Sequence, residues 1–183
     1  MNVALLGQLR QVAFDRYLSL WLMPESARDF MLALFSLEQE LLSLPGKVTN
    51  ATLGVMRVTW WRDQLSLLAN KPAPDHPVLQ ALQPYKDQAA LLADYVETFD
   101  LPFYEEDRDR RLAERAGYMA ALMHPYFPQL GLANLNLGLQ SFYKGIKVVT
   151  GPRWLRFLSS AYRITSRGKL AWLALKHSFR PED

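Results

Sequence analysis

The side chains with the clearest chemical potential are the basic ones of the C-terminal third. The stretch from Ala116 to Pro181 contains no Asp or Glu and nine Lys or Arg residues. Such a field attracts phosphates and anionic headgroups, and it repels divalent cations. We therefore expect anion binding in this part of the chain, and no carboxylate-based metal chemistry. The nine basic residues are Lys144, Lys147, Arg153, Arg156, Arg163, Arg167, Lys169, Lys176 and Arg180.

Other residue types offer less chemistry. The chain has no Cys, which excludes thiolate catalysis, a disulfide framework and zinc sites built on Cys. His76, His124 and His177 are far apart without a second ligand at metal-binding spacing, so we expect surface or capping histidines and no metal site. Glu38 and Glu40 are two residues apart and would point in different directions on a helix, so they cannot chelate one ion together. We expect both on a solvated face.

Arg57 and Arg62 belong to an expected helix that Asn50 or Thr52 would cap. Helical spacing puts the two arginines on different faces, so one interpretation is a packed helix with local ion pairs. The alternative is that one of them binds a diphosphate or an acidic partner. Trp60 and Trp61 are expected in the core and at its edge rather than around a ligand. The periodic residues of this helix are Leu53, Met56, Trp60, Trp61, Gln64, Leu65 and Leu68.

The composition fits one globular domain over residues 1–183. Half of the residues are apolar and 21% are charged, so wholesale disorder is not expected. The chain has no apolar run of about 18 residues, so we expect no membrane-spanning helix. The N-terminus has no clear cleavage signal, although it is acid-poor and amphipathic. We expect a cytoplasmic protein, or a protein of the mitochondrial matrix if the source is eukaryotic.

Apolar residues recur at intervals of three and four along almost the whole chain, which predicts an all-α bundle. The first helix is expected to reach about Met23. The second starts at Pro24, and Pro45-Gly46 stops it. The remaining helices are expected at about 52–68, 77–82, 85–99, 104–123, 130–149 and 153–177.

The tail from about residue 152 to 180 predicts a basic amphipathic helix. Four of its arginines, at spacings of three, seven and four, form one stripe. Such a helix suits the interface of an anionic membrane, where each Lys or Arg contributes on the order of 1 kcal/mol. The predicted membrane-binding residues are Arg153, Trp154, Arg156, Arg163, Arg167, Lys169 and Trp172. One alternative is a helix that docks on the bundle and shows its arginines to water. Nucleic acid is a less favoured partner, because no nucleic-acid motif accompanies the stripe.

Two segments resemble the squalene/phytoene synthase family. Met23-Pro24, Arg28 and the run Ala33-Leu34-Phe35-Ser36-Leu37 resemble its opening, in which a Pro and an Arg precede an aromatic-rich helix. Residues 53–65, LGVMRVTWWRDQL, are similar to a block typical of the proteobacterial and mitochondrial branch of the family. This second block is the specific part of the resemblance.

The resemblance continues more weakly beyond these segments. Residues 76–82 fit the same branch, while residues 112–117 and 138–140 are similar to parts of later family motifs. It is absent after about Lys147. The resemblance implies an isoprenoid-synthase-like helical bundle, shortened at the C-terminus, that encloses an apolar cavity for prenyl chains.

Active members of this family join two prenyl diphosphates, which they hold through Mg²⁺ on two facing Asp-rich motifs. In this chain the expected Asp positions of the first motif read Leu42, Ser43 and Gly46. The second motif should lie within residues 141–147, which hold two lysines and no carboxylate. Both halves of the magnesium site are therefore missing from the sequence.

A family branch with degraded Asp motifs includes an assembly factor for respiratory complex I, and this chain resembles that branch more than the true synthases. The first hypothesis is a non-catalytic protein without a cofactor, peripheral at the inner membrane, that acts on a protein partner such as a respiratory-complex subunit. Arg28, Arg57 and Arg62 are its candidate contacts to a diphosphate or to that partner. One alternative is a divergent prenyl transferase that uses Mg²⁺ or an arginine-based diphosphate site. Another is a carrier that binds an isoprenoid, a quinone or another lipid in the inherited cavity.

Overall fold

The structure is a computed structural model that describes residues 1–100, 108–144 and 152–161. Every regular element in these ranges is a helix, and no strand occurs among them, which confirms the predicted all-α class. The predicted segments 104–107, 145–149 and 162–177 lie outside the described residues, as do Arg163, Arg167, Lys169 and Trp172.

The first predicted helix is divided in two. Helix α1 spans Val3–Val12, and the side chain of Asn2 caps it by accepting hydrogen bonds from the amides of Ala4 and Leu5. Ala13 leaves the helical conformation, with φ −143° and ψ 72°, and α2 then runs over Phe14–Leu20. The prediction of one helix to Met23 was wrong, because the apolar periodicity continues across a backbone break that it cannot register.

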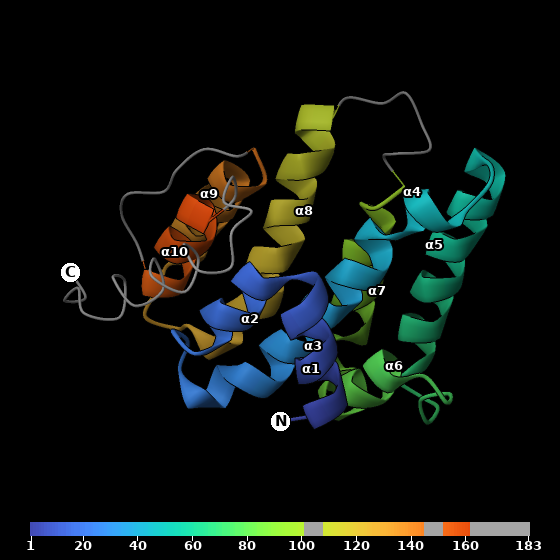
Figure 1. Ribbon diagram of the computed structural model, residues 1–183, viewed down its shortest axis with the longest axis horizontal. Helices are drawn as coiled ribbons and strands as arrows, with labels where there is room; N and C mark the ends of the chain where they lie inside the picture. The colour runs from blue at the N-terminus through green and yellow to red at the C-terminus, as the bar shows by residue number, and fades with distance from the viewer. Residues whose placement is uncertain (101–107, 145–151, 162–183) are drawn as a thin grey trace.

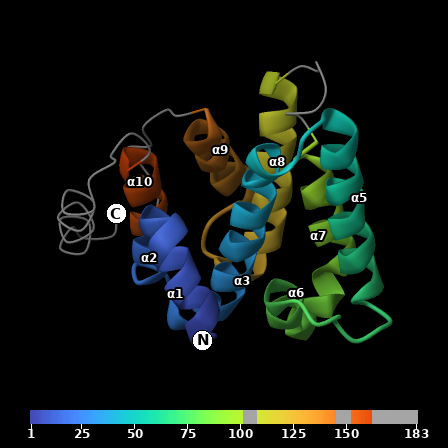
Figure 2. The same ribbon diagram turned by 45° about the vertical axis from the view of Figure 1, so that its right-hand side comes forward.

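Helix α3, Glu25–Leu42, is the central element of the bundle. It is buried along most of its length, including the predicted core residues Phe30, Met31, Leu34 and Leu37. It lies among α1, α2 and the later helices (Figure 2). The short helix α4, Leu44–Lys47, follows it, so the predicted stop at Pro45-Gly46 falls inside one further turn.

Helix α5, Ala51–Leu67, starts where the sequence predicted, because the side chain of Asn50 accepts a 2.9 Å hydrogen bond from the amide of Leu53. Helix α6 covers Pro77–Leu82 as expected. The helix predicted at 85–99 begins as the 3-10 helix η1, Gln83–Gln88, and continues as α7, Ala89–Glu97. Helix α5 packs chiefly on α7 and lies at one edge of the bundle (Figures 1 and 2).

The remaining described helices form the other side of the bundle. Helix α8 spans Arg108–Met123, the 3-10 helix η3 spans His124–Tyr126, α9 spans Leu132–Tyr143 and α10 spans Arg153–Ala161. Helix α9 packs on α8, while α10 packs on α2 and α9 (Figure 1). As a result of this packing, α3, α7, α8 and α9 contribute residues from distant parts of the sequence to one hydrophobic core.

Candidate functional site: a buried ion cluster

Glu38 is the main polar side chain at the centre of the bundle. It is only 1% exposed, and its Oε2 accepts a 2.8 Å hydrogen bond from Nε of Arg16 on α2. Nη1 of Arg16 also donates to Asp15 at 3.0 Å. The prediction of a solvated Glu38 was wrong, because α3 turns this position toward α2 and not toward water. Glu40 remains at the surface, where it accepts from Lys47 at 3.2 Å.

Two tyrosines complete the coordination of this carboxylate. The hydroxyl of Tyr143, at the end of α9, donates to Oε1 of Glu38 at 2.9 Å. The hydroxyl of Tyr95 on α7 lies 3.5 Å from the same oxygen and 3.3 Å from the Tyr143 hydroxyl. We call Arg16, Glu38, Tyr95 and Tyr143 the Glu38 cluster. It joins side chains from α2, α3, α7 and α9.

Electrostatics favour a charged guanidinium and neutral phenols in this cluster. Burial lowers the pKa of the Arg16 guanidinium, but the negative charges of Glu38 and Asp15 outweigh burial and raise that pKa above its ordinary value. Burial raises the pKa of the Tyr95 and Tyr143 hydroxyls well above their ordinary value, and the charge of Glu38 raises both further. The cluster is therefore an ion pair with two neutral phenols.

Arg115 on α8 borders the cluster. It is buried, its Nε donates to Oγ1 of Thr98 at 3.2 Å, and its guanidinium carbon lies 3.7 Å from the centre of the Phe99 ring. The Tyr143 ring lies 5.9 Å away. Sequence reasoning included Arg115 in a family-like segment and assigned it no role. No local signal identifies it, because its partners lie 17 residues away in the sequence.

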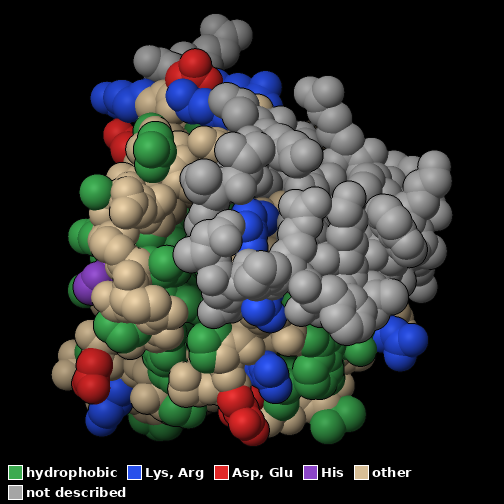
Figure 3. All heavy atoms as spheres, turned by 90° about the vertical axis from the view of Figure 1, so that its left-hand side faces the viewer, with side chains coloured by type: hydrophobic (Ala, Val, Ile, Leu, Met, Phe, Trp, Pro, Cys, Tyr) green, Lys and Arg blue, Asp and Glu red, His purple; other side chains and the backbone are tan. Residues whose placement is uncertain are grey.

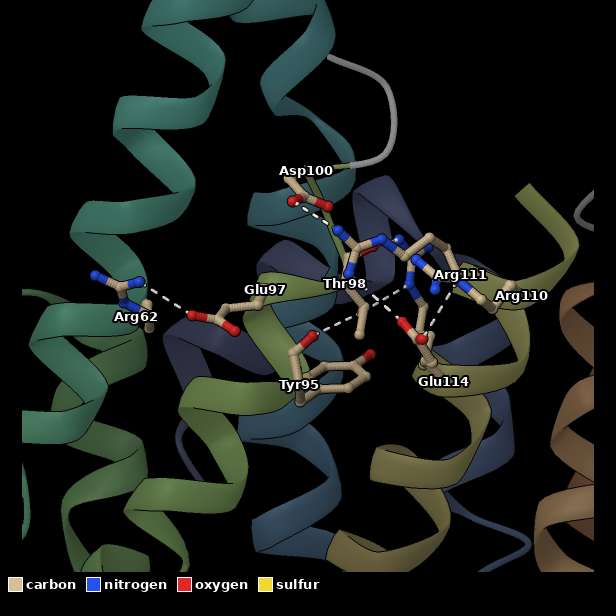
Figure 4. A network of polar contacts seen from close by, with 9 residues as sticks. Arg62, Tyr95, Glu97, Thr98, Asp100, Arg110, Arg111 and Glu114 are labelled. Carbon is tan, nitrogen blue, oxygen red and sulfur yellow. Dashed lines mark hydrogen bonds and ion pairs between the residues drawn. The ribbon is translucent and has the colours of Figure 1, made fainter. Parts of the chain in front are cut away.

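A second network lies between α5, α7 and α8 (Figure 4). Arg62 donates to Asp63 at 2.9 Å and to Glu97 on α7 at 3.0 Å. The local ion pair that helical spacing suggested for Arg62 is thus present. On α8, Arg111 donates to Asp100 at 3.0 Å and to Glu114 at 3.4 Å.

The structure does not gather the three arginines that were predicted to contact a diphosphate or a partner. Nε of Arg28 donates to the carbonyl oxygens of Leu20 and Met23, and its guanidinium lies 5.5 Å from the Trp21 ring centre. Arg28 therefore closes the turn between α2 and α3. Arg57 and Arg62 lie on different faces of α5, as predicted, and Arg57 is exposed.

The residues present do not fit a magnesium–diphosphate site. Leu42 is half exposed and apolar, and the Ser43 hydroxyl donates to the carbonyl of Glu40. At the end of α9 the positions are filled by Tyr143, which is bound to Glu38, and by Lys144. Within residues 1–100, 108–144 and 152–161, no three His, Asp or Glu side chains lie close enough to hold one metal ion. Mg²⁺ at a diphosphate site is held through one or two carboxylates beside the phosphates, and here the buried carboxylate already binds a guanidinium.

Helix α10 departs from the membrane-facing stripe predicted for it. Trp154 is buried, with its ring centre 5.3 Å from that of Phe127, and Arg156 is buried as well. Assigning these two residues to a lipid-facing surface was wrong, because α10 packs on α2 and α9 and turns them inward. Arg153 is half-buried. Several Lys or Arg side chains are visible on this side of the molecule (Figure 3).

A surface pocket of about 270 Å³ lies between α1, α3 and α6. Met1, Leu5, Asp29 and Tyr85 are among its lining residues, and Asp29 pairs with the N-terminal amine at 3.0 Å. Near the Glu38 cluster, by contrast, Phe35 and Phe142 are buried in the core.

No helix in the described ranges is both long and apolar enough to cross a membrane.

Comparison with known proteins gives one family. The model of squalene/phytoene synthases matches residues 9–100, which is half of the chain and includes α2, α3, α5 and α7. Neither the curated proteins nor the solved structures contain a match. Three members of the Glu38 cluster fall inside the matched region, and the helical fold agrees with it. The chain belongs to the squalene/phytoene synthase family and has an all-α, isoprenoid-synthase-like fold.

Proposed function

We propose that this family member acts without prenyl transfer, as a peripheral membrane protein that works through protein contacts in the assembly of a respiratory complex. One observation carries the non-catalytic part. The buried carboxylate of Glu38 is neutralised by Arg16 and bound by the Tyr143 hydroxyl. Both of its oxygens are engaged in short hydrogen bonds, so it has little capacity left to hold a magnesium–diphosphate complex.

The neighbouring positions support the same proposal. A diphosphate that leaves needs several carboxylate-bound magnesium ions, and Leu42, Ser43 and Gly46 offer no carboxylate. Glu40, which is also on α3, is half-buried and paired with Lys47. Complex I is the complex that the sequence resemblance favours. The same resemblance, together with the basic composition of residues 162–180, supports an inner-membrane location.

The catalytic alternative is tested by incubating the full chain with farnesyl or geranylgeranyl diphosphate and Mg²⁺. We expect no diphosphate release above the level of buffer. Release that Arg57→Ala or Arg62→Ala abolishes, and that Arg110→Ala on α8 leaves unchanged, would overturn the proposal in favour of a prenyl transferase. Arg110 is a matched control, because it too pairs with a carboxylate at the surface, at 3.7 Å from Glu114.

The assembly role is tested in the native host by deleting the gene and measuring assembled complex I on native gels. We expect less assembled complex, with restoration by the wild-type chain. Arg57→Glu on α5 reverses the charge of an exposed candidate partner contact, so it should restore assembly less well than Arg110→Glu. Normal complex I in the deletion strain would contradict the role.

A further inference from the structure

Helix α5 is apolar on two opposite faces. Its inner face buries Gly54, Val58, Trp61 and Leu65. Its outer face carries four large apolar side chains that remain accessible to solvent. These are Leu53, Met56, Trp60 and Leu67, which are 43%, 61%, 45% and 39% exposed.

The four exposed side chains form one stripe, which we call the outer stripe of α5. Their spacings of three, four and seven residues return to the same side of a helix. At 1.5 Å per residue the stripe is about 20 Å long. Helix α5 lies at the edge of the bundle with α7 on its inner side, and no other described helix covers the outer stripe (Figures 1 and 2).

The charges beside the outer stripe favour an anionic surface. Arg57 is exposed on one border of the stripe, and no acidic partner for it occurs among the described residues. Lys71 is exposed just beyond the end of the helix. Asp63, on the other border, is the one acidic residue of α5 and is held by Arg62 at 2.9 Å. A stripe of Trp, Met and Leu with exposed cations beside it has the chemistry of an interfacial helix.

The size of the outer stripe argues against a second copy of the chain. Four side chains exposed to this extent present on the order of 400 Å² of apolar surface, the size of a functional patch. A stable dimer buries about 800 Å² on each partner. A membrane interface has no such threshold, because each inserted side chain contributes separately to partitioning.

We propose that the outer stripe of α5 inserts into the interface of a membrane that carries anionic lipids. Trp60 would lie at headgroup level beside Trp61, 5.3 Å away between ring centres, while Met56 and Leu53 reach toward the acyl chains. Arg57 would contact lipid phosphates. This inference rests on the membrane-peripheral part of the proposed function, and it assigns the contact to a helix whose apolar residues were predicted to lie in the core and at its edge.

The test is flotation of the full chain with phosphatidylcholine vesicles, with and without phosphatidylglycerol. Met56→Ser combined with Trp60→Ser should weaken binding to the anionic vesicles about tenfold. Leu137→Ser on α9 is the matched control, since Leu137 is 65% exposed and lies on another part of the surface. The Leu137→Ser variant should bind the anionic vesicles like the wild type.

A second measurement does not depend on the affinity of a variant. Because the chain has no Cys, Met56→Cys and Leu137→Cys each create a single labelling site. An environment-sensitive fluorophore at position 56 should shift to the blue with anionic vesicles, and one at position 137 should not.

The possible failures are distinguishable. Equal binding by the wild type and the double variant, with no shift at position 56, would overturn the α5 contact alone. No binding by the wild type would overturn this contact and the membrane part of the proposed function. Loss of a dimer, or of a captured protein partner, in the double variant without loss of vesicle binding would assign the stripe to protein and overturn the inference. Diphosphate release from prenyl diphosphates would contradict the non-catalytic proposal without affecting the interpretation of vesicle binding.

Discussion

Tyr143 donates a 2.9 Å hydrogen bond to Glu38 across 105 residues of sequence. Since Arg16 holds the other oxygen of the same carboxylate, one buried charge links α2, α3 and α9. A buried ion pair adds little net stability over an apolar core, but removing one partner leaves an unpaired charge in the interior. The Glu38 cluster therefore specifies how these helices meet more than it strengthens their contact.

Arg16→Met should lower the free energy of unfolding by about 3–5 kcal/mol, because it leaves Glu38 buried without its cation. The double variant Arg16→Met, Glu38→Leu should recover much of this loss, since neither charge is then left alone. Urea denaturation followed by circular dichroism measures both. Lys47→Met, which breaks the exposed pair with Glu40, is the control and should cost about 0–1 kcal/mol. Strictly additive effects of the two core substitutions would contradict the coupling.

The sequence predicted elements better than it predicted contacts. Apolar periodicity and the cap at Asn50 placed α5 within a residue or two, because both signals are local. Periodicity could not say which apolar face meets the bundle, so Met56 and Trp60 were grouped with Trp61. The structure separates them, since only one side of α5 packs on α7.

The candidate site escaped prediction for a related reason. Glu38 was judged from its neighbour Glu40, whereas its real partners are Arg16, 22 residues earlier, and Tyr143. Burial of a charge depends on what the tertiary fold supplies opposite it, and no local spacing encodes that. The lack of carboxylates at Leu42, Ser43 and Gly46, in contrast, is a matter of residue identity and needs no knowledge of the tertiary fold.

Tyr95 and Tyr143 should stay protonated in the folded protein at a pH that ionises ordinary tyrosines. Burial and the charge of Glu38 raise both pKa values in the folded state. The unfolded chain releases these protons near pH 10, whereas the folded chain retains them. The folded state then binds more protons, so stability is complete below about pH 10 and falls as the pH rises beyond it.

Tyrosinate absorbance checks this titration. Above about pH 10, the native protein should show at least two fewer phenolates than the unfolded chain, out of eight tyrosines. Tyr143→Phe should reduce that difference by one and make the alkaline loss of stability shallower. Identical titration curves for the native and unfolded protein would refute the buried phenols.

Gly138 on α9 lies directly against the buried side chain of Leu155 on α10. A Cβ added there would meet Cδ2 of Leu155 at 2.5 Å, and Leu155 is itself buried. Gly138→Ala should therefore destabilise the protein by about 1–3 kcal/mol. Gly117→Ala on α8 is the control, because nothing lies within 4 Å of its added Cβ, and Ala favours a helix by roughly 0.5–1 kcal/mol. The midpoint temperatures of thermal denaturation of the two variants should shift in opposite directions. A stabilising Gly138→Ala would show that α9 and α10 do not pack this closely.

We expect replacement of Arg115 by Lys to destabilise the folded protein. Its guanidinium carbon lies 3.7 Å from the centre of the Phe99 ring. Its Nε donates to the hydroxyl of Thr98, and that hydroxyl donates to the carbonyl of Tyr95. A lysine keeps the charge but has neither the planar face nor the fixed donors for these contacts. Arg115→Lys should cost about 1–3 kcal/mol in the free energy of unfolding. Arg110→Lys at the solvated start of the same helix should cost no more than about 1 kcal/mol. Equal and small effects at the two positions would mean that Arg115 acts only as a charge, and that its contacts with Phe99 and Thr98 add nothing to stability.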